Sequence, residues 1–127
     1  MKAITIFWGK VTTGAKRGKV LGYPTANINL HKKIPEGIYA SEVTVNGKPY
    51  QAATFIGTAK TFGEKEYKAE SFLLNFNQNM YGQWISIRLY KKLRSNKKFE
   101  SQEALIQQMK KDIAETEKFF NEYDFDK

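Results

Sequence analysis

The stretch from residue 9 to residue 27 holds the residue types best suited to binding a phosphate. It contains four glycines and four basic side chains: Gly9, Gly14, Gly18 and Gly22, with Lys10, Lys16, Arg17 and Lys19. Glycine lets a backbone approach a ligand closely and adopt positive φ without steric cost. Ala15 stands where a Walker A motif needs lysine, and no helix is expected next, so this is not a P-loop. The stretch indicates another kind of phosphate loop, or a basic loop that only connects two strands.

Two neutral oxygen ligands follow this loop directly. Thr25 and Asn27 are two residues apart, so in an extended chain both side chains leave the same face. Magnesium usually takes one or two protein ligands and completes its shell with phosphate oxygens and water. The pair therefore suits a magnesium–nucleotide complex, although threonine in a strand is also ordinary.

A carboxylate occurs within an otherwise apolar alternation in residues 67–76. Glu70 shares one predicted strand face with Phe72, Leu74 and Phe76, and these three indicate the interior. We expect the carboxylate to be partly desolvated, which raises its pKa and suits a general base. The alternative is a glutamate at the rim of the sheet, paired with a lysine.

Arg94 opens a charged segment after the last predicted strand, close to Lys97, Lys98 and Phe99. A guanidinium in this position could clamp a phosphate or stack on an aromatic ligand. The alternative is a solvated arginine on the surface.

The composition narrows the classes of protein. A chain of 127 residues suggests one domain, and the net charge of +8 favours phosphorylated or polyanionic partners. The absence of cysteine leaves no disulfide or thiolate site and fits the cytoplasm. The only histidine, His31, is expected on the surface, so no Ser-His-Asp triad can form. No apolar run reaches the length of a membrane span, so we expect no membrane partner.

Six strands and one helix must position these residues. The helix follows the apolar spacing of Leu105, Met109, Ile113 and Phe120, begins after an N-cap at Ser101 and ends near Asn121. Asn46-Gly47 predicts a tight hairpin, and 12–22 and 57–66 are expected as loops. This order predicts a small antiparallel barrel with a helix packed on it. The expected strands are 3–11, 24–30, 38–45, 49–56, 67–76 and 84–93.

Together these features resemble the riboflavin kinase (flavokinase) family. The matching residues occur in the family's order over about residues 9–113. They are Gly9-x-Val11, Gly14, Gly18-Lys19-x-Leu21-Gly22-Tyr-Pro24-Thr-Ala-Asn27, Pro35-x-Gly37-x-Tyr39-Ala40, Ile56-Gly57, Thr61-Phe62, Glu70, Tyr81-Gly82, Leu93-Arg94, Phe99, Leu105 and Asp112. The resemblance implies a mainly β fold, a six-stranded antiparallel Greek-key-type barrel with one C-terminal α-helix, forming a single riboflavin kinase domain over 1–127.

The resemblance also implies an activity, transfer of the γ-phosphate of ATP to the 5′-hydroxyl of riboflavin to give FMN. Thr25 and Asn27 would bind Mg²⁺ or another divalent metal, and Glu70 would be the catalytic base. Arg94 and its loop would lie by the flavin. The expected partners are riboflavin/FMN and ATP/ADP, with no nucleic acid, and the protein is expected to be a monomer. The family's nucleotide-binding residues fall on Gly14, Gly18, Lys19, Gly22 and Pro24.

Some positions depart from the family pattern. Ala59-Lys60 replaces a common Asn-Pro, which loosens that loop, and Lys19 replaces a frequent arginine, which removes a bidentate phosphate contact. Bacterial relatives commonly carry an adenylyltransferase domain in front, whereas this sequence starts at the first barrel strand, so FAD synthesis is not expected. Two alternatives stay open: a flavin- or nucleotide-binding module without catalysis, and a basic barrel that binds single-stranded nucleic acid.

Overall fold

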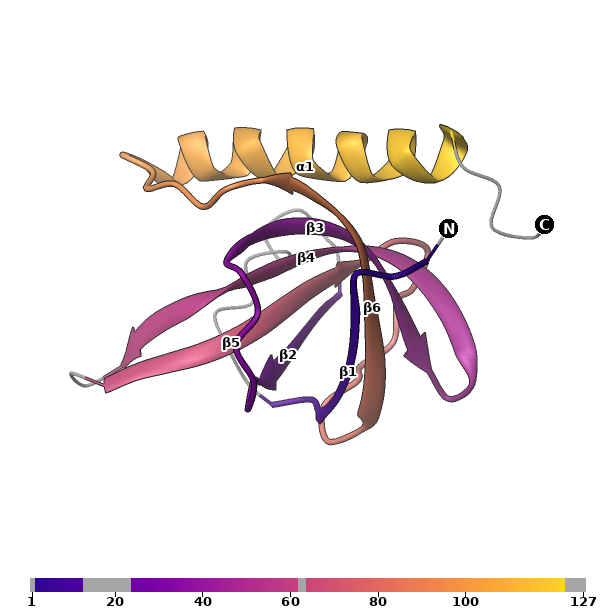
Figure 1. The fold of residues 1–127 in the computed structure, drawn as a ribbon. Helices are drawn as coiled ribbons and strands as arrows, with labels where there is room; N and C mark the ends of the chain where they lie inside the picture. The colour runs from indigo at the N-terminus through magenta and orange to yellow at the C-terminus, as the bar shows by residue number, and fades with distance from the viewer. Residues whose placement is uncertain (1, 13–23, 62–63, 123–127) are drawn as a thin grey trace.

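The computed structural model describes residues 2–12, 24–61 and 64–122, with the backbone alone described at 59–61 and 64–66. One antiparallel sheet of six strands curls into a barrel-like shape, and a single helix lies across it (Figure 1). The strand order in the sheet is β1-β6-β3-β4-β5-β2. This confirms the predicted mainly β fold with a C-terminal helix. The elements are β1 (Thr5–Lys10), β2 (Thr25–Asn29), β3 (Gly37–Val45), β4 (Lys48–Thr61), β5 (Glu64–Leu73), β6 (Trp84–Arg94) and α1 (Gln102–Glu122).

The two edges of the sheet meet at one point in the described chain. Just beyond β1, Thr12 forms a β-bridge with Asn27 of β2, and the Thr12 amide donates to the Asn27 carbonyl at 2.7 Å. Nearby, a Cβ added at Gly9 would lie 2.8 Å from Ile28, so only glycine allows this approach of β1 to β2. The two edges of the curled sheet therefore touch beside one of the predicted metal ligands.

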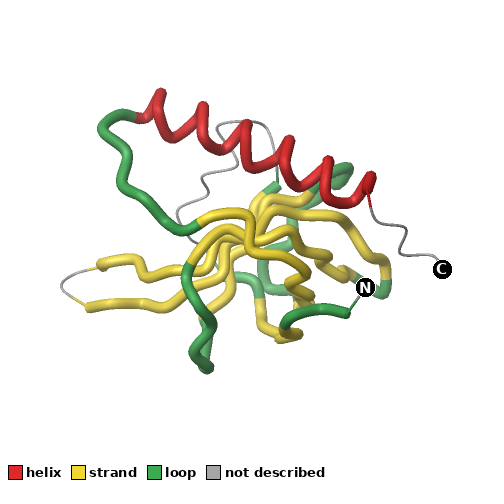
Figure 2. Tube along the Cα trace, turned by 45° about the horizontal axis from the view of Figure 1, so that its top comes forward, coloured by secondary structure: helices red, strands yellow, loops and turns green. Residues whose placement is uncertain are grey.

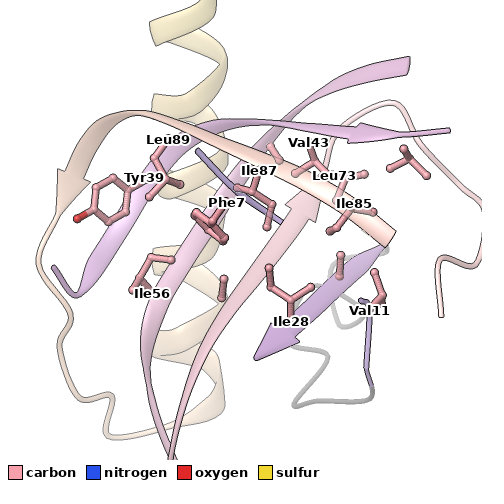
Figure 3. Close-up of a cluster of buried hydrophobic side chains, with 14 of the residues drawn as sticks. Phe7, Val11, Ile28, Tyr39, Val43, Ile56, Leu73, Ile85, Ile87 and Leu89 are labelled. Atoms are coloured by element: carbon pink, nitrogen blue, oxygen red, sulfur yellow. The ribbon is translucent and has the colours of Figure 1, made fainter. Parts of the chain in front are cut away.

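The interior of the curled sheet is filled by aliphatic and aromatic side chains from all six strands (Figure 3). Ile85, Ile87 and Leu89 alternate along β6 and are buried, which confirms the face predicted for this strand. Burying one such side chain contributes roughly 1.5–3 kcal/mol to stability. The interior therefore supplies much of the driving force for folding.

A short chain of hydroxyl groups crosses this apolar interior. Ser41 Oγ lies 2.6 Å from Thr54 Oγ1, which lies 2.7 Å from Ser71 Oγ, and all three residues are fully buried. Ser41 Oγ also donates to the Ala52 carbonyl at 2.9 Å. Because each hydroxyl has a partner, the polar groups of β3, β4 and β5 are buried without the cost of an unsatisfied donor.

Two hairpins join the central strands, and the sequence predicted only one of them. Asn46 and Gly47 both have positive φ, 52° and 79°, as the predicted tight turn requires. The loop predicted over 57–66 is wrong, because β4 and β5 continue pairing in register as far as Thr61 opposite Glu64. Each strand supplies the other with backbone partners, and this tertiary pairing overrides the weak strand propensity of a polar, lysine-bearing segment.

Helix α1 begins at a cap and lies over the outer face of the sheet (Figures 1 and 2). Ser101 Oγ accepts a hydrogen bond from the Ala104 amide at 3.1 Å, which confirms the predicted N-cap. The buried side of the helix packs on the sheet in two clusters, Met109 with Phe72 and Ala53, and Phe119 and Phe120 with Ala40. Both faces of the central strands are therefore covered. In the described ranges no helix is long and apolar enough to cross a membrane.

Candidate active site

Asn27, Glu70 and Phe55 lie side by side in one row across three neighbouring strands of the sheet. Glu70 of β5 is the register partner of Asn27 on β2 and of Phe55 on β4. Side chains directly opposite one another on antiparallel strands have Cβ atoms about 4.5–5.5 Å apart. Thr25 lies on the same face of β2, two residues from Asn27. The fold therefore brings the predicted metal ligands and the predicted base together.

The face that carries Glu70 is not the interior of the barrel, which corrects the prediction. On β5 the interior is filled by Ala69 and Leu73, whereas Phe72 packs against Met109 of the helix. The period-two pattern also stops after Leu73, because β5 ends there and Asn75 adopts a φ of 57°. Phe76 then joins the interior cluster from beyond the strand. The sequence shows that a strand face is buried, but not which layer covers it.

Burial at this row is nearly complete. Asn27 and Glu70 are each 3% exposed, and Thr25 is half-buried. The prediction that Glu70 leaves bulk water is confirmed, since its residue lies beneath neighbouring elements.

The donor set around Asn27 fits a hard divalent cation. Thr25 offers a hydroxyl oxygen, Asn27 an amide oxygen, and the Glu70 carboxylate stands on the adjacent strand. Magnesium prefers oxygen ligands and retains several places for phosphate and water. Among residues 2–12, 24–61 and 64–122, no group of three or more His, Cys, Asp or Glu side chains could hold a metal. A magnesium ion held here would thus take most of its shell from a nucleotide and water.

A cavity of about 590 Å³ opens beside the row, between the outer face of the sheet and the first half of α1. Phe55 and Phe72 of the sheet and Leu105 and Met109 of the helix give it apolar walls. Because Phe55 is the register partner of Glu70, the row leads from the predicted metal ligand Asn27 into this cavity. Polar and charged residues complete its lining, among them Asn96, Lys97 and Lys98. A cavity that combines apolar walls with polar groups is typical of a small-molecule site.

The segment between β6 and α1 forms the other wall of the cavity and is tied down at two points. Asn96 Nδ2 donates to the Ile56 carbonyl at 3.1 Å. This approach needs Gly57, where an added Cβ would lie 3.1 Å from Asn96 Nδ2 and 2.5 Å from the Phe55 ring. The second point is the pair formed by Arg94 and Asp112.

Arg94 binds Asp112 through two parallel hydrogen bonds. Its Nε donates to Oδ1 and its Nη2 to Oδ2, each at 2.7 Å, while Nη1 donates to the Ser95 carbonyl at 3.1 Å. Gln108 Nε2 also donates to Asp112 Oδ1 at 3.0 Å. Such bidentate, charge-assisted pairs are strong and geometrically specific. Arg94 thus lines the cavity and fastens its wall to the helix, and a direct contact with ligand stays a prediction.

Of the remaining predicted site residues, only Pro24 is among the residues that the structure describes. Pro24 precedes β2, where its carbonyl accepts from the Leu73 amide at 3.1 Å. Gly14, Gly18, Lys19 and Gly22, the residues predicted to cover the nucleotide phosphates, lie outside the described residues. Their contribution stays a prediction.

Sequence reasoning gave no role in the site to Phe55 or Asp112, although Asp112 matches the family pattern. Phe55 lies on the strand predicted over 49–56, for which no buried face was assigned, and only the register with Glu70 places it at the site. Asp112 carried a usable signal, because it is a charged residue that falls between Met109 and Ile113 on the apolar side of the helix. Gln108 and Thr116, four residues away on either side, extend this polar line along the helix.

Comparison with protein sequences places these features among known proteins. A family model described as Flavokinase, riboflavin kinase, matches residues 3–120. The bifunctional riboflavin kinase/FMN adenylyltransferase of Bacillus subtilis (strain 168) is 40% identical over 119 residues, which cover 89% of this chain and 38% of that protein. The chain therefore spans well under half the length of this relative.

Two solved structures share the fold. The riboflavin kinase from Trypanosoma brucei aligns with a TM-score of 0.64 at 29% sequence identity, covering 91% of this chain and 79% of that one. A Streptococcus pneumoniae structure described as a macrolide-efflux protein aligns with a TM-score of 0.77 at 32% identity, covering 88% of this chain and 38% of that one.

Proposed function

Because the chain belongs to the riboflavin kinase (flavokinase) family, we propose that it transfers the γ-phosphate of ATP to the 5′-hydroxyl of riboflavin, giving FMN and ADP. One observation carries this proposal, the row of Asn27, Glu70 and Phe55. The row joins a predicted metal ligand, a buried carboxylate and a cavity with aromatic side chains in its walls. Phosphoryl transfer needs these parts together, because its catalysis depends on positioning, charge neutralisation and a base near the attacking oxygen.

In this proposal Glu70 accepts the proton of the attacking hydroxyl. The ribityl oxygen forms a bond to the γ-phosphorus, the bond from that phosphorus to the bridging oxygen of ADP breaks, and the proton passes to a Glu70 carboxylate oxygen. The position of Glu70 supports this role, since it is nearly fully buried and lies opposite Asn27 on the neighbouring strand. A base of this kind typically contributes about 10²–10⁴-fold to the rate.

Thr25 and Asn27 would hold Mg²⁺ together with the phosphates. When bound, the cation neutralises charge that gathers on the transferred group and the leaving group. The two side chains fix the position of the phosphates relative to Glu70, because all three residues belong to paired strands. Gly14, Gly18, Lys19 and Gly22 would complete the nucleotide site.

The flavin ring would occupy the cavity beneath α1. Phe55, Phe72, Leu105 and Met109 offer apolar surface to a flat aromatic ring. The cavity of about 590 Å³ lies within the range of roughly 300–1,000 Å³ found for small-molecule sites. A ribityl chain leaving the ring toward β5 and β2 would bring its terminal hydroxyl to Glu70.

We further propose that residues 1–127 act as one riboflavin kinase domain that works as a monomer in the cytoplasm. The family model supports the first point because it spans residues 3–120. The absence of cysteine from the chain supports a reducing compartment.

An assay of FMN formation tests the activity directly. The purified protein is mixed with riboflavin and with ATP, CTP or GTP in turn, each with magnesium, manganese or zinc, and FMN is separated from riboflavin by chromatography. We expect FMN with ATP and magnesium. Riboflavin or FMN binding without turnover in any combination would contradict the kinase and favour a binding module that lacks catalysis.

A further inference from the structure

A second cavity lies at another end of the barrel and has a different chemistry. Its volume is about 450 Å³, and we call it the lysine cavity because Lys32, Lys33 and Lys92 line it. Ile4, Ile34, Pro35 and Tyr39 contribute apolar surface. Figure 3 shows Tyr39 at one end of the core cluster, with its hydroxyl oxygen directed away from the other side chains.

The charge of the lysine cavity is uncompensated within its walls. Among the described residues that line it there is no aspartate or glutamate. Lys32 Nζ is held instead by neutral groups, donating to Thr5 Oγ1 at 3.2 Å and to the Ile6 carbonyl at 3.1 Å and lying 5.9 Å from the centre of the Phe7 ring. These contacts fix the ammonium group without neutralising it. A fixed cationic group beside a hollow attracts an anion.

The Tyr39 phenol adds no negative charge to the lysine cavity. Its hydroxyl donates to the Pro35 carbonyl at 2.6 Å. Burial, together with the nearby Tyr67 side chain, raises the pKa of Tyr39 above its ordinary value, so the phenol stays neutral at physiological pH. The hydroxyl also keeps Pro35 in place on the cavity wall.

We propose that the lysine cavity binds a phosphate monoester carried on a compact aromatic group. Three exposed lysines line the cavity, and their combined positive charge suits the nearly double negative charge of a phosphate monoester better than the single charge of a carboxylate. Lysine serves phosphate as a point charge, and the apolar walls offer a place for the group that carries it. The inference does not depend on the proposed kinase activity, because none of its residues belongs to the row or to the cavity beneath α1.

The two cavities lie on opposite sides of one short segment. Pro35 and Tyr39 line the lysine cavity, whereas Glu36 and Ile38 line the cavity beneath α1. On β6, Lys92 belongs to the first and Arg94 to the second. Isoleucine methyl groups can therefore report on each cavity separately, Ile4 and Ile34 on one and Ile38 on the other.

Methyl NMR on the full chain with labelled isoleucines tests the site. Phenyl phosphate is the probe, inorganic phosphate supplies the charge alone, and phenol supplies the aromatic group alone. We expect phenyl phosphate to shift Ile4 and Ile34 in a saturable way and to bind more tightly than either fragment. Shifts confined to Ile38, or equal affinity for phenol, would overturn the proposal.

Charge-removing variants provide the second measurement. We expect Lys32→Gln and Lys92→Gln each to weaken phenyl phosphate binding about two- to fivefold, the effect of one partly exposed charge. Lys91→Gln is the matched control, because it removes the same charge from the next residue of β6, which lines neither cavity. Equal weakening by Lys91→Gln would show a general charge effect and no site. Unchanged thermal melting of the variants establishes that they are folded.

Discussion

The two faces of β5 are both buried, yet they are built for different purposes. Toward the barrel interior the strand presents Ala69, Ser71 and Leu73, which pack among aliphatic side chains or complete the hydroxyl chain. Toward the helix it presents Glu70 and Phe72, which border a cavity and the predicted metal ligands. In the interior, the hydroxyl groups of Ser41, Thr54 and Ser71 are paired with one another. The contrast on β5 indicates that the proposed kinase chemistry lies on the face covered by the helix, while the interior residues of this strand maintain the shape of the sheet.

The sharpest way to separate the two faces is to remove the proton acceptor while keeping its volume. We expect Glu70→Gln to lower kcat by about 10²–10⁴-fold, because the amide cannot accept the proton of the attacking hydroxyl. Thermal stability and riboflavin binding should change little. Single-turnover FMN formation together with riboflavin titration measures both effects.

Glu42→Gln is the matched control for that experiment. Glu42 lies on β3 opposite Arg88, is only half-buried and lines neither cavity. We expect this variant to retain its turnover. If Glu70→Gln kept the same turnover as Glu42→Gln, Glu70 would not be the base.

A deletion on the other face of the same strand should affect stability and spare chemistry. Leu73 is fully buried in the interior, so Leu73→Ala should lower the free energy of unfolding by about 2–5 kcal/mol. Below its melting temperature the folded variant should keep its kcat. Denaturant titration and kinetics at low temperature measure the two quantities, and a loss of kcat in the folded fraction would contradict the division between the faces.

The smallest expected effect concerns the wall of the cavity. Asp112→Asn replaces one acceptor of the Arg94 guanidinium by a donor, so we expect a loss of about 1–3 kcal/mol in stability. Because this pair holds the segment that borders the cavity, KM for riboflavin should rise more than kcat falls.

Glu115→Gln serves as the comparison for the cavity wall, since Glu115 is an exposed acid on the same helix. It should change neither stability nor KM. A rise in KM for ATP alone in Asp112→Asn would place the wall at the nucleotide and not at the flavin.

Local signals in the sequence were sufficient for most elements. The hairpin at Asn46-Gly47, the apolar alternation of β6 and the cap at Ser101 each depend on neighbouring residues, and each is confirmed. The far end of the β4–β5 hairpin depends on pairing between strands, so composition misassigned residues 57–66 as loop.

For the candidate site, the sequence predicted which residues take part but not how the strands align them. Residue type and spacing selected Thr25, Asn27 and Glu70, whereas the row that aligns Asn27 with Glu70 and Phe55 is set by register. Strand alternation predicted that Glu70 is buried. It could not predict that a helix covers this face, because the helix is distant in sequence. For the same reason the pairing of Arg94 with Asp112, eighteen residues apart, could not be predicted from local pattern.

The bridge between Thr12 and Asn27 has a consequence for motion. Strands within the sheet are joined by ladders of five or more register pairs, whereas the described edges share this one β-bridge and the packing of Gly9 on Ile28. Protein segments open first where the fewest contacts hold them. The contact between the two edges of the sheet should therefore open more readily than the ladders within it, and it includes the predicted metal ligand Asn27. A nucleotide and metal bound at Asn27 would stabilise the contact between the two edges. Amide hydrogen exchange at Thr12 should therefore slow when they bind.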